Sequence, residues 1–127
     1  MKFFIIDDSP VTREIIIKEI SKKRSSNPDD SFTEANDGME ALTIIKSSID
    51  IDIILCDWNM PNMNGIDFVK VLRKLDKYKE TKLLMVTTES DRKNVLMAIA
   101  AGVNDYITKP IDGDKIWLKI KNFFPEA

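Results

Sequence analysis

Short apolar runs alternate along the chain with longer segments in which apolar and polar residues are mixed. Each run has the length of a β-strand. The strongest are apolar on both faces, as parallel strands are when helices cover both sides of their sheet. The pattern predicts five strands, of which the second is the weakest: Phe3–Ile6, Phe32–Ala35, Ile51–Cys56, Leu83–Val86 and Tyr106–Ile107.

Three of the intervening segments carry apolar residues at the spacing of an amphipathic helix. Ser9 and Pro10 predict the start of the first helix, because serine caps helix N-termini and proline suits the first helical position. Gly102 is expected just past the end of another helix, and the polar stretch Lys22–Ser31 predicts a loop. The expected helix faces are Val11, Ile15, Ile16 and Ile20; Phe68, Val69, Leu72 and Leu75; and Ile116, Ile120, Phe123 and Phe124.

This alternation of strands and helices predicts an α/β fold, a single doubly wound (βα)5 domain of the flavodoxin-like type. Its five-stranded parallel sheet has helices on both faces. The 127 residues, 43% of them hydrophobic, suit one domain over 1–127 that builds its core without disulfides. An all-helical bundle is disfavoured because the runs at 51–56 and 83–86 have no helical period.

Composition and charge exclude several classes of function. Nineteen Lys and Arg against 21 Asp and Glu argue against binding to nucleic acid. No run approaches the roughly 20 apolar residues of a membrane span. A single cysteine, Cys56, is expected in the core and fits a reducing, cytoplasmic location. The chain has no histidine, which excludes catalytic triads that contain histidine and metal sites with histidine ligands.

Polar residues follow the strands at the carboxyl edge of the predicted sheet, where open α/β sheets bind ligands. Asp7 and Asp8 follow the first strand, Asp57 the third, Thr87 the fourth and Lys109 the fifth. Two carboxylates about 5 Å apart repel by roughly 3 kcal/mol at an effective dielectric constant near 20. A proton or a cation must therefore relieve the repulsion among three of them. Oxygen ligands without histidine favour Mg²⁺.

The same residues suit phosphoryl transfer to a carboxylate. Asp57 is the predicted nucleophile because it stands alone at the centre of the sheet, whereas Asp7 and Asp8 form a pair suited to the metal. In this hypothesis Mg²⁺ contacts one phosphoryl oxygen and Lys109 a second. The hydroxyl of Thr87, with a backbone N–H, contacts the third. A lone Asp after a strand is more often a helix or turn cap, and Lys-Pro by itself carries no signal, so the prediction depends on the combination.

Five segments resemble the response-regulator receiver domain, and in particular the chemotaxis members of that family. The segment with the Trp and the Met-Pro-Asn-Met run is the most specific, and together the five extend over nearly the whole chain. They are Ile5–Pro10, Glu34–Leu42, Cys56–Gly65, Met85–Glu89 and Ala101–Pro110.

The resemblance implies that a separate histidine kinase phosphorylates Asp57. The protein would then be a switch that catalyses only its own phosphorylation and dephosphorylation, not an enzyme acting on other substrates. It implies Mg²⁺ held by the side chains of Asp8 and Asp57 and the backbone carbonyl of Asn59, with Asp7 acting through water. The bond between Lys109 and Pro110 resembles one that is cis in this family.

The resemblance also implies how the signal leaves the site. Thr87 would move toward the phosphoryl group and Tyr106 would swing inward, remodelling the face made by the fourth helix, fifth strand and fifth helix. On that face Val95, Ile99, Tyr106 and Lys119 offer an apolar strip with a basic edge. An amphipathic acidic helix, such as that of the flagellar motor switch protein, would suit it.

Three features depart from the family pattern. Thr88 stands where a small residue is usual, and its bulk would narrow access to the site. Asn64 replaces an acidic residue before Gly65. The loop near Arg24–Asp30 is several residues longer than in the enteric chemotaxis member of the family. Asn59 and Glu89 occupy positions that in the family tune the rate at which the phosphoryl group is lost.

Other functions remain open at this stage. A phosphorelay intermediate, passing the phosphoryl group to a histidine on another protein, would use the same chemistry at Asp57. An aspartate-nucleophile phosphatase is disfavoured because Asn59 stands where its general acid would be. We expect a monomer without an output domain, since the last helix ends near Phe124, although a fragment of a larger regulator would look the same. The same face could instead form a dimer, and an accessory phosphatase is a further expected partner.

Overall fold

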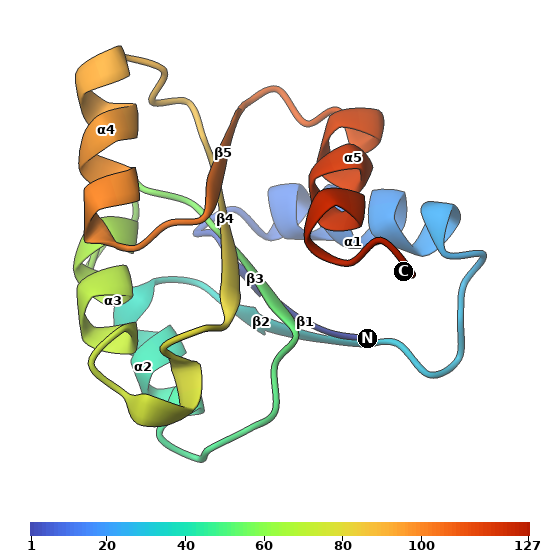
Figure 1. Ribbon diagram of the computed structural model, residues 1–127, viewed down its shortest axis with the longest axis horizontal. Coiled ribbons are helices and arrows are strands. Elements are labelled where there is room, and N and C mark those ends of the chain that lie inside the picture. The colour runs from blue at the N-terminus through green and yellow to red at the C-terminus, as the bar shows by residue number, and fades with distance from the viewer.

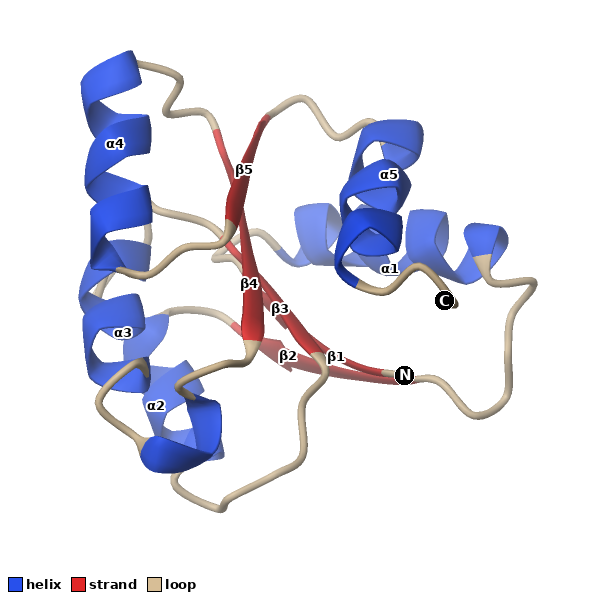
Figure 2. Cartoon of the chain, viewed as in Figure 1, coloured by secondary structure: helices blue, strands red, loops and turns tan.

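The computed structural model describes residues 1–127, which form one parallel sheet between two layers of helices (Figure 1). The strands lie in the order β2-β1-β3-β4-β5. Helices α1 and α5 cover one face of the sheet, and α2, α3 and α4 cover the other (Figure 2). The flavodoxin-like (βα)5 prediction is confirmed. The elements are β1 (Lys2–Ile6), α1 (Pro10–Lys23), β2 (Ser31–Ala35), α2 (Gly38–Ile45), β3 (Ile53–Cys56), α3 (Gly65–Leu72), a 3-10 turn (Asp76–Tyr78), β4 (Lys82–Thr87), α4 (Arg92–Ala101), β5 (Asp105–Thr108) and α5 (Gly113–Phe123).

Alternate side chains of the central strands build two separate cores, because successive residues of a strand point to opposite faces. Phe4, Ile6, Ile54 and Cys56 pack beneath α2, α3 and α4. Their neighbours along the strands, such as Phe3 and Ile5, pack beneath α1 and α5. Cys56 lies in the core, as expected.

The register of the strands sets where the functional edge lies. Ile6 pairs with Cys56, so the next residues, Asp7 and Asp57, leave the sheet at the same level. On the other side, Thr87 pairs with Thr108, one residue before Lys109.

The predicted helix ends are confirmed. The Ser9 hydroxyl accepts the N–H of Thr12, and Pro10 begins α1. Gly102 ends α4 with a φ of 115°, a left-handed conformation that glycine adopts without a steric penalty. The peptide between Lys109 and Pro110 is cis. None of the helices combines the length and the apolar character that crossing a membrane requires.

Two predicted ranges were too long. The third strand begins at Ile53, not Ile51, because Asp52 lies outside the ladder and its carboxylate accepts the backbone N–H of Lys2. The predicted loop at 22–31 begins at Arg24, because α1 extends through Lys23.

All three predicted helix faces were also partly wrong. Phe124 lies beyond α5, which ends at Phe123. Leu75 lies beyond α3, which ends at Leu72. In α1, Ile16 and Ile20 are buried, whereas Val11 and Ile15 lie on the solvent side and are 65% and 42% exposed. Only part of the predicted apolar face of α1 therefore packs against the sheet.

Replacing Phe68 with alanine tests the core beneath α3. The side chain is fully buried, so Phe68→Ala should lower the free energy of unfolding by about 3–5 kcal/mol. Urea unfolding followed by circular dichroism would measure the loss. Leu118→Ala, at a residue 60% exposed on α5, is the control and should change stability by less than about 0.5 kcal/mol. A loss below 1 kcal/mol for Phe68→Ala would contradict this packing.

Candidate functional site

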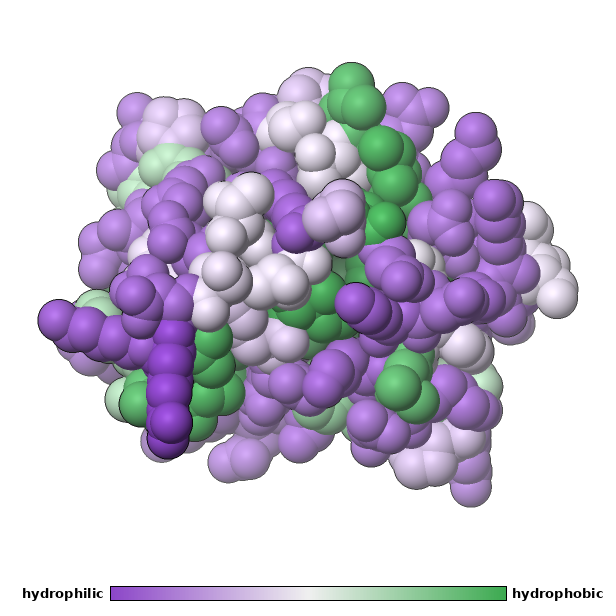
Figure 3. All heavy atoms as spheres, turned by 90° about the horizontal axis from the view of Figure 1, so that it is seen from above, coloured by the Kyte–Doolittle hydropathy of each residue, from purple (hydrophilic) through white to green (hydrophobic).

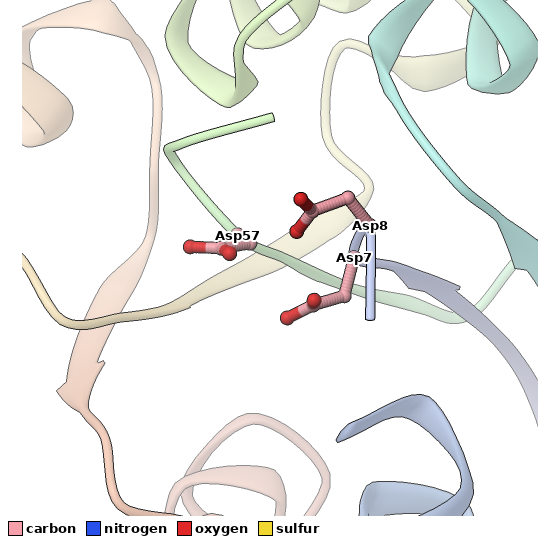
Figure 4. Close-up of side chains that lie close together, drawn as sticks. All are labelled: Asp7, Asp8 and Asp57. Atoms are coloured by element: carbon pink, nitrogen blue, oxygen red, sulfur yellow. The ribbon is translucent and has the colours of Figure 1, made fainter. Parts of the chain in front are cut away.

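Three carboxylates meet at the carboxyl edge of the sheet (Figure 4). Asp7 and Asp8 follow β1, and Asp57 follows β3. One oxygen from each lies within 4.8 Å of the others. Asp7 and Asp57 are buried, and Asp8 is exposed. The structure therefore brings together the three acidic residues that the sequence placed at this edge.

The ammonium group of Lys109 bridges two of these carboxylates. Its Nζ lies 2.9 Å from Asp7 Oδ2 and 3.1 Å from Asp57 Oδ2. Burial by itself would lower the pKa of Lys109, but the hydrogen bonds to Asp7 and Asp57 outweigh it and raise that pKa. Burial raises the pKa of Asp7, against the lowering effects of Lys109 and of the Ser9 N–H. One ammonium among three carboxylates leaves an excess of negative charge, which fits a divalent cation bound through oxygen.

Backbone contacts fix the position of Asp57. Its N–H donates to the Ile6 carbonyl over 2.9 Å, and its Oδ1 accepts the Trp58 N–H over 2.7 Å. Its other carboxylate oxygen contacts Lys109. The Gly65 N–H donates to the Trp58 carbonyl, which closes the loop from β3 to α3 behind the site. The Asn59 carbonyl accepts no hydrogen bond from the protein.

Thr87 and Tyr106 are joined through the backbone of Glu89. Thr87 is fully buried at the end of β4, and its hydroxyl accepts the Glu89 N–H over 3.4 Å. The Tyr106 ring is partly buried against the core beneath α3 and α4, and its hydroxyl donates to the Glu89 carbonyl. Burial, aided by the charges of Glu89 and Asp57, raises the pKa of Tyr106 to about 12. The hydroxyl therefore remains a donor at physiological pH.

The Glu89 side chain makes a second link, which the sequence alone did not reveal. One carboxylate oxygen accepts from the Asn59 amide over 2.7 Å, and the other accepts from the Asn94 amide over 3.1 Å. Asn59 belongs to the loop after β3, whereas Asn94 lies in the first turn of α4. The sequence feature that could have indicated this role of Asn94 is its amide side chain, near the start of the helix that follows Glu89.

The predicted partner-binding residues lie on α4, β5 and α5, with different exposures. Val95 is half-buried and Ile99 is 47% exposed. Lys119 forms an ion pair with Asp105 over 2.9 Å. The structure adds two exposed residues of α4 that the sequence analysis missed, Leu96 and Met97.

In the view from above, green hydrophobic residues form narrow patches within a mostly hydrophilic surface (Figure 3).

Gly65 lies directly against Asp57. A Cβ added there would stand 2.1 Å from the Asp57 carbonyl oxygen, a backbone atom that cannot move aside alone. Gly65→Ala should therefore displace Asp57 and lower the free energy of unfolding by about 1–3 kcal/mol.

Gly113→Ala is a matched control at the start of another helix. The atoms nearest to its added Cβ are not backbone atoms but those of the Glu19 side chain, whose flexible carboxylate end lies at 2.3 Å and whose Cβ lies at 3.2 Å. We expect its stability, measured by urea unfolding, to stay within about 0.5 kcal/mol of wild type. Equal losses in the two variants would contradict the assignment of strain to Asp57.

The buried negative charge of Asp7 should destabilise the folded, metal-free protein at neutral pH. Folding raises the pKa of Asp7, so its favourable contribution is present below the unfolded value, near 3.8, and is lost as pH rises through the folded value. Asp7→Asn should therefore raise Tm at pH 7 by about 2–5 °C, which corresponds to roughly 1 kcal/mol for a chain of this length.

Thermal unfolding in chelator between pH 3 and 7 measures this effect. The gain should shrink as pH falls through the folded pKa of Asp7 and should be gone below the unfolded value, near 3.8. Asp29→Asn, at an exposed loop position, is the control and should leave Tm unchanged. A lower Tm for Asp7→Asn at pH 7 would mean that the ion pair with Lys109 outweighs the burial of the charge.

Comparison with solved structures finds the same fold in chemotaxis proteins. The chain superimposes on Vibrio cholerae CheY4 with a TM-score of 0.85 at 28% identity, covering 97% of this chain and 98% of that one. A chain of the CheX–CheY–BeF3–Mg²⁺ complex from Borrelia burgdorferi gives a TM-score of 0.83 at 27% identity. That match covers 98% of this chain and 89% of the other.

Sequence comparison gives the family. A CheY homolog of Campylobacter jejuni is 39% identical over 110 residues, which are 87% of this chain and 82% of that protein. The response regulator receiver domain matches residues 3–121. The resemblance in the five sequence segments is thus confirmed, and the chain belongs to the response regulator receiver domain family.

Proposed function

We propose that this receiver domain is a switch in which Asp57 takes a phosphoryl group from a histidine of a separate kinase. A carboxylate oxygen of Asp57 would form a bond to phosphorus. The bond from phosphorus to the donor imidazole nitrogen would break, and that nitrogen would keep the electron pair. The observation that carries the proposal is the buried Asp57 carboxylate, fixed by Trp58 and Lys109 beside two further carboxylates. The chain has no histidine, so the donor must be another molecule.

The acidic residues fit Mg²⁺ as the cofactor. The side chains of Asp8 and Asp57 and the Asn59 carbonyl would hold it, with Asp7 acting through water. Support comes from three carboxylate oxygens within 4.8 Å and from a carbonyl that no protein donor occupies. Hard oxygen donors in this number are what Mg²⁺ prefers. When bound, the cation neutralises negative charge on the phosphoryl oxygens.

Lys109 and Thr87 would contact the two remaining phosphoryl oxygens. Lys109 already lies between Asp7 and Asp57, so its ammonium group can follow the negative charge onto the phosphoryl group. The Thr87 hydroxyl accepts only a long hydrogen bond from Glu89, which is weak at 3.4 Å. Its movement toward the phosphoryl group would therefore cost little.

The signal would leave the site through Tyr106 and α4. Movement of Thr87 would shift the Glu89 backbone, to which the Tyr106 hydroxyl is bound. That shift would remodel the face of α4, β5 and α5, where Val95, Ile99, Tyr106 and Lys119 would bind a target. An amphipathic acidic helix suits this apolar strip with a basic edge. Relatives named as chemotaxis proteins support a role in chemotaxis, with the flagellar motor switch as the proposed target.

Tryptophan fluorescence tests the switch, because Trp58 adjoins Asp57. In Trp117→Phe, which leaves Trp58 as the only tryptophan, Mg²⁺ should produce a saturable change. Beryllofluoride, which mimics a phosphoryl group on a carboxylate, should then produce a second change. Adding Asp57→Asn should weaken the Mg²⁺ response and abolish the second one. A beryllofluoride response that survives Asp57→Asn would exclude Asp57 as the acceptor.

Amide hydrogen exchange provides a second readout in the same samples. Beryllofluoride with Mg²⁺ should alter exchange in α4 and β5, and should leave it unchanged in the Asp57→Asn protein. If the parent protein responded to neither Mg²⁺ nor beryllofluoride, the proposed switch would be wrong.

A further inference from the structure

Arg13 is a buried charged residue in the first turn of α1, and the proposed phosphorylation chemistry does not use it. It is only 8% exposed. Its Nη1 donates to the Asp7 backbone carbonyl and, over 2.9 Å, to Asn36 Oδ1. Its Nε donates to Glu34 Oε1 over 3.0 Å. Burying a guanidinium group is costly unless its donors are paired, so these contacts hold the group in one position.

The hydrogen bond to Asp7 differs from the other two because its acceptor is a backbone carbonyl beside the acidic site. The Asp7 carbonyl belongs to the peptide that joins Asp7 to Asp8, the two carboxylates supplied by β1. The Asp8 N–H donates to no protein acceptor. The hydrogen bond from Arg13 is therefore the only one between that peptide and the rest of the protein. The nearby start of α1 offers no substitute donor at Pro10, which lacks an N–H.

The contact of Arg13 with Asn36 connects its guanidinium group to α2 and holds it in place. Asn36 lies in the loop between β2 and α2, and its amide also donates to Glu40 in α2 over 3.1 Å. The Asp7 N–H donates to the Ala35 carbonyl at the end of β2. The peptide on the N-terminal side of Asp7 is thus held by β2, and the peptide on its C-terminal side is held by Arg13.

We propose that Arg13 is a positioning residue for the cation site. By holding the peptide between Asp7 and Asp8, it keeps both carboxylates turned toward Asp57. Unlike Lys109, it forms no ion pair with any of the three carboxylates, so it acts through the backbone. The inference rests on the proposed Mg²⁺ site and adds a residue outside the ligand set.

Arg13→Gln isolates the relevant bond. The amide nitrogen of glutamine stands where Nε of arginine does, so the contact with Glu34 can persist while the donor to Asp7 is lost. With Mg²⁺ alone as the probe, fluorescence titration should give a Kd at least fivefold above wild type. The rise in Tm that saturating Mg²⁺ produces should shrink as well. A purely structural role would lower Tm equally with and without Mg²⁺.

Glu34→Gln is the matched control, because it changes the partner of Nε and leaves the bond to Asp7 in place. Glu34 is 46% exposed, and its variant should bind Mg²⁺ within twofold of wild type. If folded Arg13→Gln bound Mg²⁺ as wild type does, Arg13 would have no positioning role. If wild type bound no Mg²⁺, the proposed cation site itself would fail, which is a distinguishable result.

Nitrogen-15 NMR of wild type keeps the inference testable if Arg13→Gln does not fold. The Nε–H resonance of Arg13 should shift with Mg²⁺ and reach half of its full shift at the Kd found by fluorescence. A resonance that does not respond while Trp58 does would overturn the inference.

Discussion

The ammonium group of Lys109, held between the carboxylates of Asp7 and Asp57, allows two buried like charges to lie at adjacent strand ends. Without it, folding would have to protonate one carboxylate or expose it to water. Even with this ion pair, burial raises the pKa of Asp7. The chain thus keeps a concentration of negative charge at one edge of its sheet, which a bound cation or a proton would relieve.

The sheet makes this concentration unavoidable. β1 and β3 are neighbours although an entire strand and two helices separate them in sequence. The pairing of Ile6 with Cys56 brings the following aspartates to one level. A shift of one residue in this register would turn Asp57 away from Asp7 and place Cys56 at the edge instead. The same apolar residues that bury the strands therefore also set the spacing of the carboxylates.

The fold could be predicted from the sequence because its strongest signals are local. Strand-length apolar runs and the cap at Ser9 each depend on a few adjacent residues. The gathering of Asp7, Asp57 and Lys109 followed from topology, since parallel strands end at a common edge. The roles of Arg13 and Asn94 could not be predicted, because each depends on the direction in which a polar side chain turns. Arg13 turns toward the Asp7 carbonyl and Asn94 toward the Glu89 carboxylate, which the apolar and polar pattern does not give. The exposed side of α1 was mistaken for core because apolar periodicity gives the direction of a helix face but not its width.

Helix α4 differs from the other helices in how lightly it is attached. Ala98 is its one buried residue, whereas α3 buries five, among them Phe68 and Leu72. Little apolar contact therefore opposes a displacement of α4, and segments of this kind open at low free-energy cost. In the proposed switch, two placements of this helix would lie close in energy, and a change of charge at Asp57 would redistribute the population between them. The weak packing of α4 would thereby determine how strongly the domain responds to phosphorylation.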